Sequence, residues 1–266
     1  LIDYNLHDAR LAYKILKKSK VIDLTIKRSL LTGMQLDRVN ASIASLDSLY
    51  LKEMQKKKLV APSHIISGSD REEQIKGGYV RESKPGIYNN IVVLDFKSLY
   101  PSIIRTFNID PISYLGIAKD NIDDNVIIAP NKACFKNENG ILPNLIEILW
   151  QSRDLAKKNG DVLESNAIKI LMNSFFGVLA NPMCRFYNLN IANAITHFGQ
   201  YLIKLTAKII EKNFGYEVIY SDTDSIFVNI KNRSNNPYEI GKKIQEHVNA
   251  YYKNFIKEKY KRNSFL

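Results

Sequence analysis

The stretch Tyr220-Ser221-Asp222-Thr223-Asp224-Ser225 places two carboxylates at a polar corner between two β-prone runs. The flanking runs, Glu217 to Tyr220 and Ile226 to Ile230, are rich in β-branched and aromatic residues, which favour a half-buried strand. Asp, Thr and Ser favour a turn, so the pattern predicts a β-hairpin with Asp222 and Asp224 at its tip. Taken alone, this tip fits a solvated surface turn as well as it fits an acidic functional site.

A second acidic position favours the functional interpretation. Asp95 ends the apolar run Ile91-Val92-Val93-Leu94, which predicts a strand from Ile91 to Phe96. If this strand lies beside the hairpin, the carboxylates form a cluster of hard oxygen ligands, which Mg²⁺ and Mn²⁺ accept. The sequence therefore predicts a candidate divalent-metal site.

Composition indicates a globular protein with a polyanionic partner. The chain has 266 residues, 45% of them hydrophobic, which is enough for one large or two modest domains. Its 38 Lys and Arg outnumber 27 Asp and Glu, giving a net charge of +11. From Lys231 onward, nine Lys or Arg face three Glu, a local balance of +6. A solvated amphipathic helix and a nucleic-acid-binding surface both fit this stretch.

Several classes are disfavoured. Only Cys134 and Cys184 are present, without a CxxC motif or a His cluster, so we expect neither a disulfide framework nor a zinc site, and a reducing, cytoplasmic compartment. No uninterrupted apolar run approaches the roughly 18 to 20 residues of a membrane span, so we expect no membrane partner. The chain starts at Leu1 within a helical pattern, and we expect it to be a fragment.

The middle of the chain predicts a pair of antiparallel helices. They run from about Pro143 to Lys158 and from about Asp161 to Leu179, and the Asn159-Gly160 signal between them leaves only a short connection. Other elements are expected as follows: helices over residues 1–30, 188–213 and from 237; a strand from Tyr79 to Glu82 after the breaker Gly77-Gly78; a helix with Pro101 at its first position; a hairpin or loop turn at Asn139-Gly140.

The two helices carry possible phosphate-binding faces. Arg153 and Lys157 are four residues apart and share one face, while Lys169, Asn173 and Phe176 share another. Three cations and an aromatic ring on antiparallel helices suit a triphosphate and a stacked base. Two ordinary surface faces fit the same spacing, although Phe176 is unusual on a purely solvated face.

Three stretches together resemble the conserved motifs of family B DNA polymerases, in the family's order. DFKSLYPSII, from Asp95 to Ile104, looks like motif A; KILMNSFFG, from Lys169 to Gly177, looks like motif B; YSDTDS looks like motif C. The stretches KGGYVRESKPGIYNNIVVLDFKSLYPSIIRTFNIDP and ILPNLIEILWQSRDLAKKNG are similar in detail to the bacterial repair enzymes of this family. The resemblance spans the chain from about Leu1 to its end.

The resemblance implies a metal centre in the palm. Asp95 and Asp224 would hold two Mg²⁺ ions, for which Mn²⁺ can substitute, with the Phe96 carbonyl as a further ligand. Asp222 and Thr223 would shape the turn and support the ligands rather than bind metal.

The resemblance also implies a nucleotide site. Backbone N–H groups of Ser98, Leu99 and Tyr100 would hold phosphate oxygens, and Tyr100 would lie under the sugar and exclude a 2′ hydroxyl. The remaining dNTP-binding residues would be Arg153, Lys157 and Lys169, which clamp the triphosphate, with Asn173, which positions it, and Phe176, which stacks on the nascent base pair.

Some positions depart from the family pattern. Phe176 stands where the family usually has Tyr, and Ser221 stands where it usually has Gly. Tyr4 and Asp8 match the third exonuclease motif, Tyr-x-x-x-Asp, but the other exonuclease motifs are absent, so these two residues would be a remnant of a proofreading domain.

The implied fold is α+β: a palm with an antiparallel sheet backed by helices and an inserted antiparallel helical fingers pair. The expected division is 1–30 as exonuclease remnant, 31–78 as a linker or N-terminal-type segment, 79–135 as palm with motif A, 136–182 as fingers with motif B, and 183–266 as palm with motif C, the thumb being missing.

The implied function is template-directed DNA polymerisation in bacterial repair or replication restart. Expected partners are primer–template DNA and dNTPs, with a sliding clamp as a further partner of the full-length protein. The main alternative is a catalytically deficient fragment that binds DNA and nucleotides but lacks the thumb. A nucleotidyl cyclase also uses two palm carboxylates with two metals, but it does not need a fingers pair or motif B.

Overall fold

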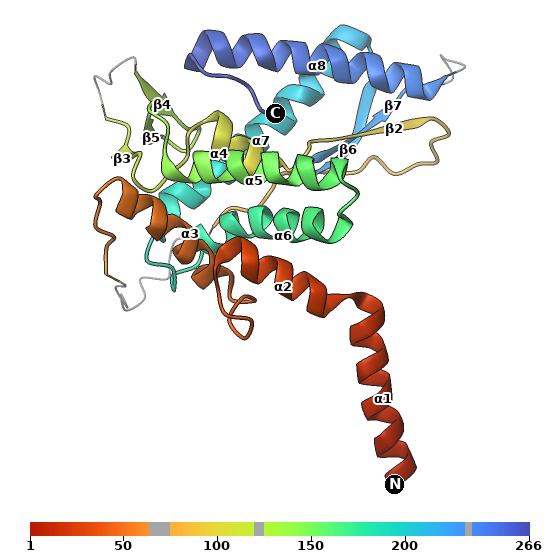
Figure 1. Cartoon of the computed structure of the whole chain (residues 1–266). Coiled ribbons are helices and arrows are strands. Elements are labelled where there is room, and N and C mark those ends of the chain that lie inside the picture. The colour runs from red at the N-terminus through yellow and green to blue at the C-terminus, as the bar shows by residue number, and fades with distance from the viewer. Residues whose placement is uncertain (64–74, 120–124, 232–235) are drawn as a thin grey trace. The chain divides into compact units, whose positions relative to one another are not determined.

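The computed structural model describes residues 1–63, 75–119, 125–231 and 236–266. It divides into two compact units, one formed by residues 1–63 and 145–178 and the other by residues 64–144 and 179–266. We call these unit 1 and unit 2. The architecture combines helices with antiparallel sheets, which confirms the predicted α+β class (Figure 1).

Unit 2 is built on a four-stranded antiparallel sheet in the order β1-β6-β7-β2. The strands are β1 (Val80–Arg81), β2 (Ile91–Asp95), β6 (Glu217–Asp222) and β7 (Ser225–Asn229). Strands β6 and β7 form the predicted hairpin, and β7 also pairs with β2. The acidic tip of the hairpin therefore lies at the same end of the sheet as the last residue of β2.

Two long helices cover one face of this sheet, α7 (Leu189–Phe214) over β6 and β7 and α8 (Pro237–Tyr260) over β2 (Figure 1). Val218 and Val228 face the helices and are fully buried, whereas Val93, on the opposite face, is 53% exposed. This alternation follows from the two-residue period of a strand. Asn188 and Asn236 cap the two helices by accepting hydrogen bonds from backbone N–H groups of the first turn.

The segment after β2 supplies part of the core of unit 2. Helix α4 (Leu99–Thr106) is buried except for the half-buried Tyr100, and it packs against α7. Phe107 follows α4 and stacks on Phe198 of α7 with ring centroids 3.7 Å apart. A three-stranded antiparallel sheet, in the order β3-β5-β4, comes next, formed by β3 (Tyr114–Ile117), β4 (Val126–Ile128) and β5 (Ala133–Lys136).

Unit 1 is helical. It contains α1 (Ile2–Ser19), α2 (Val21–Thr32) and α3 (Ser42–Lys56), together with most of α5 (Ile141–Lys158) and α6 (Val162–Leu179). Helices α5 and α6 run in opposite directions and are joined by a short turn, as predicted, in which Asp161 N–H donates to the Ala156 carbonyl at 2.8 Å (Figure 1). No residue of α1 is buried, although it presents several large apolar side chains.

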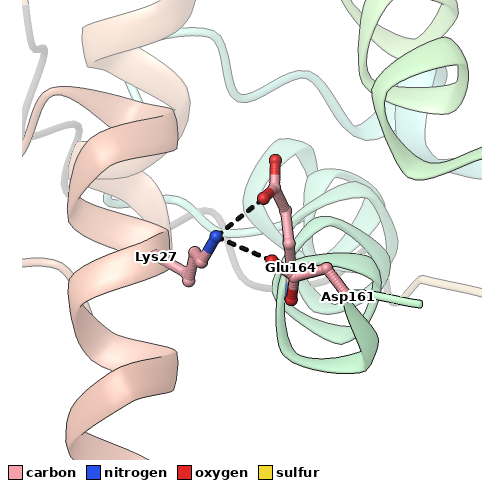
Figure 2. Close-up of polar contacts among 3 residues, drawn as sticks. All are labelled: Lys27, Asp161 and Glu164. Atoms are coloured by element: carbon pink, nitrogen blue, oxygen red, sulfur yellow. Dashed lines mark hydrogen bonds and ion pairs between the residues drawn. The ribbon is translucent and has the colours of Figure 1, made fainter. Parts of the chain in front are cut away.

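An ion-pair cluster ties α2 to the start of α6. The Lys27 ammonium lies 2.8 Å from a carboxylate oxygen of Asp161 and 2.8 Å from one of Glu164 (Figure 2). Asp161 also caps α6, because its side chain accepts a hydrogen bond from Glu164 N–H. The two carboxylates raise the pKa of Lys27, mainly through these hydrogen bonds.

Some predicted boundaries differ from the structure. Helix α5 begins at Ile141 rather than Pro143, and Asn139-Gly140 lies in a loop that leads into it, so the hairpin alternative is wrong. Pro101 is the third residue of α4, not the first, a position where its missing N–H still costs no intrahelical bond.

The predicted segments are distributed over the two units. Residues 145–178 of the predicted 136–182 fingers group with the N-terminal helices in unit 1. In the predicted 31–78 segment, residues 42–56 form α3, which buries Leu46 and Tyr50, and residues 64–74 lie outside the described residues.

Helix α6 is long and apolar enough to cross a membrane when only length and composition are considered. Its 18 residues have a mean hydropathy of 1.2, although no uninterrupted apolar run was apparent in the sequence. In this structure 44% of the helix is buried, and a core helix of a water-soluble protein passes the same test.

Candidate active site

The hairpin tip is a two-residue turn with a strained backbone. Thr223 and Asp224 connect Asp222 to Ser225, and Thr223 has φ of 49°. Positive φ is rare for a β-branched residue, and such a conformation costs on the order of 1–3 kcal/mol. Backbone hydrogen bonds hold it, because Thr223 N–H donates to the Tyr79 carbonyl at 3.0 Å and Asp224 N–H to the Asp222 carbonyl at 2.5 Å.

The Gly77-Gly78 segment braces this turn, a role that the sequence analysis missed. A Cβ on Gly78 would lie 2.6 Å from Thr223 Oγ1, so any other residue at position 78 would require Thr223 to shift. Gln200 of α7 donates to the Gly77 carbonyl at 2.8 Å and fixes the segment from the other side. In the sequence, the glycine pair predicted only a break in regular structure before β1, and not a contact with the hairpin tip.

The structure brings Asp95 and Asp224 together. Asp95 lies opposite Ser225 in the β2–β7 ladder, and the next N–H, that of Phe96, donates to the Asp224 carbonyl at 2.9 Å. The two acidic residues are thus neighbours at the joint end of β2 and the hairpin. Asp224 is half-buried, and Asp95 is exposed.

Asp222 occupies a different position from Asp224. It lies opposite Ser225 on β6, so two strand spacings, about 9–10 Å, separate its backbone from that of Asp95. Its carboxylate accepts hydrogen bonds from the hydroxyls of Thr223 at 3.0 Å and Tyr220 at 3.4 Å. These contacts lie within the hairpin and fit the predicted supporting role.

The electrostatics of the site reflect this arrangement. Burial raises the pKa of Asp224, and the nearby charges of Asp95 and Asp222 raise it further. Burial, followed by the charge of Asp224, also raises the pKa of Tyr100. Two carboxylates that oppose each other's ionisation would both be stabilised by a cation between them.

The oxygen atoms at this position suit a Mg²⁺ ion whose other ligands are water and substrate oxygens. Asp95, Asp224 and the Phe96 carbonyl offer hard oxygen atoms, and Mg²⁺ is commonly held by one or two carboxylates with substrate phosphates. Within residues 1–63, 75–119, 125–231 and 236–266, no three His, Cys, Asp or Glu side chains group closely enough for an all-protein metal cage.

Helix α4 begins directly after Asp95 and Phe96. Ser98 is its N-cap with φ of 50°, and the first N–H groups of a helix have no intrahelical acceptor. These N–H groups, including those of Leu99 and Tyr100, form the positive end of the helix dipole. The ring of Tyr100 packs near Gly199 of α7, where an added Cβ would lie 3.6 Å from its Cε1.

The predicted triphosphate residues belong to unit 1. Lys157 near the end of α5 and Lys169 and Asn173 on α6 are exposed, and Phe176 is half-buried. Arg153 is only 8% exposed. Both helices therefore carry exposed polar groups at the predicted positions, Lys157 on α5 and Lys169 and Asn173 on α6. Arg153 on α5 is buried instead.

The remaining predicted residues, Tyr4 and Asp8, lie one helical turn apart on α1. Both are exposed, Tyr4 to 71%. Their spacing matches the exonuclease motif, but α1 buries none of its residues.

Unit 2 also contains a cavity of about 410 Å³ between β2 and α8. Its lining includes Asp95, Phe96, Thr206 and Val248, but not Asp224 or Tyr100. It lies largely on the helix-covered side of the sheet, and Asp95 and Phe96 border both this cavity and the end of the sheet that carries the hairpin tip.

Comparison with known proteins gives consistent matches. The model of DNA polymerase family B matches residues 39–260. The chain is 38% identical over 255 residues to DNA polymerase II of Escherichia coli strain K12, covering 95% of this chain and 32% of that protein. It is 33% identical over 245 residues to the DNA polymerase of Thermococcus gorgonarius, covering 85% and 31%.

A solved structure agrees with these matches. The family B DNA polymerase of the archaeon Pyrobaculum calidifontis superposes with a TM-score of 0.68 at 25% identity, covering 99% of this chain and 34% of that one. The chain spans about a third of the length of the relatives that it matches.

Proposed function

Because the chain belongs to DNA polymerase family B, we propose that it is the palm-and-fingers part of a DNA-directed DNA polymerase. Unit 2 contains the palm, and α5 and α6 are the fingers. The reaction is the extension of a DNA primer on a template with deoxynucleoside triphosphates. The observation that carries the proposal is the pairing of Asp95 and Asp224, neighbours through the 2.9 Å bond from Phe96 N–H to the Asp224 carbonyl.

The acidic residues of the palm hold the divalent metal in this proposal. Asp95, Asp224 and the Phe96 carbonyl would hold two Mg²⁺ ions, for which Mn²⁺ could substitute. When bound, the metal activates the primer 3′ hydroxyl and neutralises charge on the pyrophosphate leaving group. Asp222 and Thr223 keep the turn in its strained form and so keep Asp224 beside Asp95.

The start of α4 binds the incoming nucleotide. N–H groups of Ser98, Leu99 and Tyr100 donate to phosphate oxygens, and the helix dipole favours the negative charge there. The ring of Tyr100, packed near Gly199, forms a floor under the sugar. A 2′ hydroxyl would meet this floor, so the site selects deoxyribonucleotides.

The fingers helices carry the remaining proposed nucleotide-binding groups. Lys157 and Lys169 carry exposed ammonium groups that attract the triphosphate, and Arg153 adds a third positive charge from an enclosed position. Asn173 orients the phosphates, and Phe176 stacks on the nascent base pair. With Phe in place of the usual Tyr, stacking remains while any hydroxyl contact is absent.

The family also supports a proposal for the wider context. We place this chain within a longer polymerase with a thumb, an exonuclease domain that includes Tyr4 and Asp8, and a sliding clamp as partner. Its work would be repair or replication restart in a bacterial cytoplasm. DNA binding by the 266-residue chain should depend steeply on salt, since phosphate neutralisation supplies most of it.

Primer extension by the 266-residue chain at low salt tests the proposal. We expect template-dependent incorporation with Mg²⁺ or Mn²⁺, abolished in Asp224→Asn and largely retained in Asp222→Asn, because only Asp224 adjoins Asp95. Equal loss in both variants would contradict the assignment. The Tyr100→Ala variant should incorporate ribonucleotides more readily, and unchanged sugar selection would remove the steric role of Tyr100.

A second candidate is a catalytically deficient fragment that binds DNA and nucleotides. The same assay separates the two candidates, because DNA binding without any incorporation supports the deficient fragment.

A further inference from the structure

Three distant segments of unit 2 meet at a buried polar junction away from the carboxylates. We call it the root junction. It is formed by the end of α4, the loop from β5 into α5, and the segment that follows α8: Thr106, Asn108, Asp110, Asn137, Asn139, Gly140, Arg262. Thr106, Asn108 and Asp110 are each 0% exposed.

Asn108 joins the end of α4 to the loop that precedes α5. It has φ of 50°, and its amide donates to the carbonyls of Lys136, at 2.7 Å, and Glu138. Its side-chain oxygen accepts from Gly140 N–H at 2.8 Å. One buried side chain thus fixes the backbone on both sides of residue 139.

Asp110 holds the first turn of α5. Its carboxylate accepts from Leu142 N–H, the second residue of that helix, and from Ile112 N–H at 2.8 Å. A Cβ on Gly140 would lie 2.6 Å from Asp110 Cβ, so the loop is in direct contact with Asp110. The carboxylate caps α5 from a separate segment, the favoured charge for a helix N-terminus.

Arg262 connects the segment after α8 to both of the others. Its Nε donates to the Thr106 carbonyl at 2.9 Å. Its Nη1 donates to the Asn137 carbonyl at 2.9 Å and side-chain oxygen at 3.0 Å, and its Nη2 to Asn139 at 3.1 Å. A planar guanidinium can make these bonds at once, and an ammonium group cannot.

The segment after Arg262 adds two further contacts to the end of α4. Phe265 N–H donates to Thr106 Oγ1 at 3.1 Å, and the Arg105 guanidinium lies over the Phe265 ring, 3.8 Å from its centroid. Tyr260 packs edge-on to Phe107 at 5.0 Å and is itself held by Asn137, which donates to its carbonyl at 3.1 Å. Each of the three segments is therefore hydrogen-bonded to both of the others.

We propose that Arg262 is a positioning residue of the nucleotide site, which fixes the end of α4 and the first turn of α5 to one another within unit 2. This rests on the proposed function, in which α4 and α5 both carry triphosphate-binding groups. The phosphate-binding groups of α4 lie at its start, and the end of the same short helix is tied at this junction to the first turn of α5 and to Arg262. Misplacement of binding groups by about 1 Å can cost on the order of 10²-fold in rate.

The test compares Arg262→Met and Arg262→Lys with Lys261→Met, which removes the neighbouring exposed cation. For primer extension by the 266-residue chain, Arg262→Met should raise the KM for dNTP by about 10- to 10²-fold, with a smaller change in kcat and unchanged DNA affinity. Arg262→Lys should recover only part of the loss, and Lys261→Met should match the parent. A Met variant whose KM for dNTP stays within twofold of the parent would overturn the proposal, even if its Tm fell.

Hydrogen exchange tests the role of Arg262 independently of the proposed function, because it does not require primer extension. Without DNA, amides 140–144 should exchange faster in Arg262→Met than in the parent or in Lys261→Met, and equal exchange would overturn the proposal. If the parent chain does not extend primers, the proposed function fails, and faster exchange in Arg262→Met still supports the positioning of α5 by Arg262. Circular dichroism confirms that each variant is folded before either measurement.

Discussion

Ser221 is a buried polar residue whose replacement should stabilise the protein. It is 1% exposed on the helix-covered face of β6, and within the part of the chain that the structure describes its hydroxyl has no hydrogen-bond partner. A buried hydroxyl without a partner costs about 1–3 kcal/mol. Ser221→Ala removes the hydroxyl and keeps Cβ, so the remaining space is that of one oxygen atom. We therefore expect a gain of about 1–2 kcal/mol in the free energy of unfolding.

Ser102 provides a matched control. It is also 1% exposed, but its hydroxyl donates to the Lys97 carbonyl at 3.0 Å. Ser102→Ala should therefore lower the free energy of unfolding by about 0.5–1.5 kcal/mol. Each variant removes one atom, the hydroxyl oxygen of a buried serine. The two sites differ in that the hydroxyl of Ser102 makes a hydrogen bond and, among the described residues, the hydroxyl of Ser221 does not.

Thermal and urea unfolding of the metal-free chain measure both effects. At about 2–4 °C per kcal/mol for a unit of this size, Ser221→Ala should raise Tm by about 2–8 °C, and Ser102→Ala should lower it. If Ser221→Ala lowers Tm as much as Ser102→Ala does, the hydroxyl of Ser221 is satisfied and the reasoning fails.

Three further predictions follow from the same structure. Because the pKa of Asp224 is raised by burial and by Asp95, its charge destabilises the metal-free fold above that pKa, and the penalty disappears as the pH falls toward the ordinary Asp value near 3.9. Asp224→Asn should therefore raise Tm in EDTA at pH 7, and a lower Tm would contradict this. Lys27→Met should lower Tm more at low salt than at 1 M NaCl, where ion pairs are screened, whereas Lys14→Met on exposed α1 should not. Tyr252→Phe should cost about 1 kcal/mol in urea unfolding, because its hydroxyl donates to a buried carbonyl of α7 at 2.8 Å, whereas Tyr251→Phe should be neutral.

Local pattern was sufficient to predict most elements of the fold. The hairpin at Tyr220–Ser225, the strand ending at Asp95 and the paired helices α5 and α6 each have a strong signal within a few residues. Boundaries were less accurate where a distant residue decides them. Helix α5 starts at Ile141 because Asp110, far away in the sequence, caps its first turn.

The sequence predicted the acidic residues of the candidate site better than it predicted the residues that hold them in place. The acidic residues share a recognisable motif, but the pairing of Asp95 with Ser225 is a long-range register that no local pattern contains. The roles of Gly78 and Arg262 depend on close approach and on hydrogen bonds to backbone carbonyls, which leave little trace in the sequence. The burial of Arg153 likewise depends on packing rather than on its helical spacing.

Binding of Mn²⁺ to the chain in the presence of dNTP, followed by electron paramagnetic resonance, tests the central claim most directly. If Asp95 and Asp224 share the metal centre, Asp95→Asn and Asp224→Asn should each abolish dNTP-dependent binding, and Asp222→Asn should leave most of it. Retention of binding in Asp224→Asn together with its loss in Asp222→Asn would contradict the account.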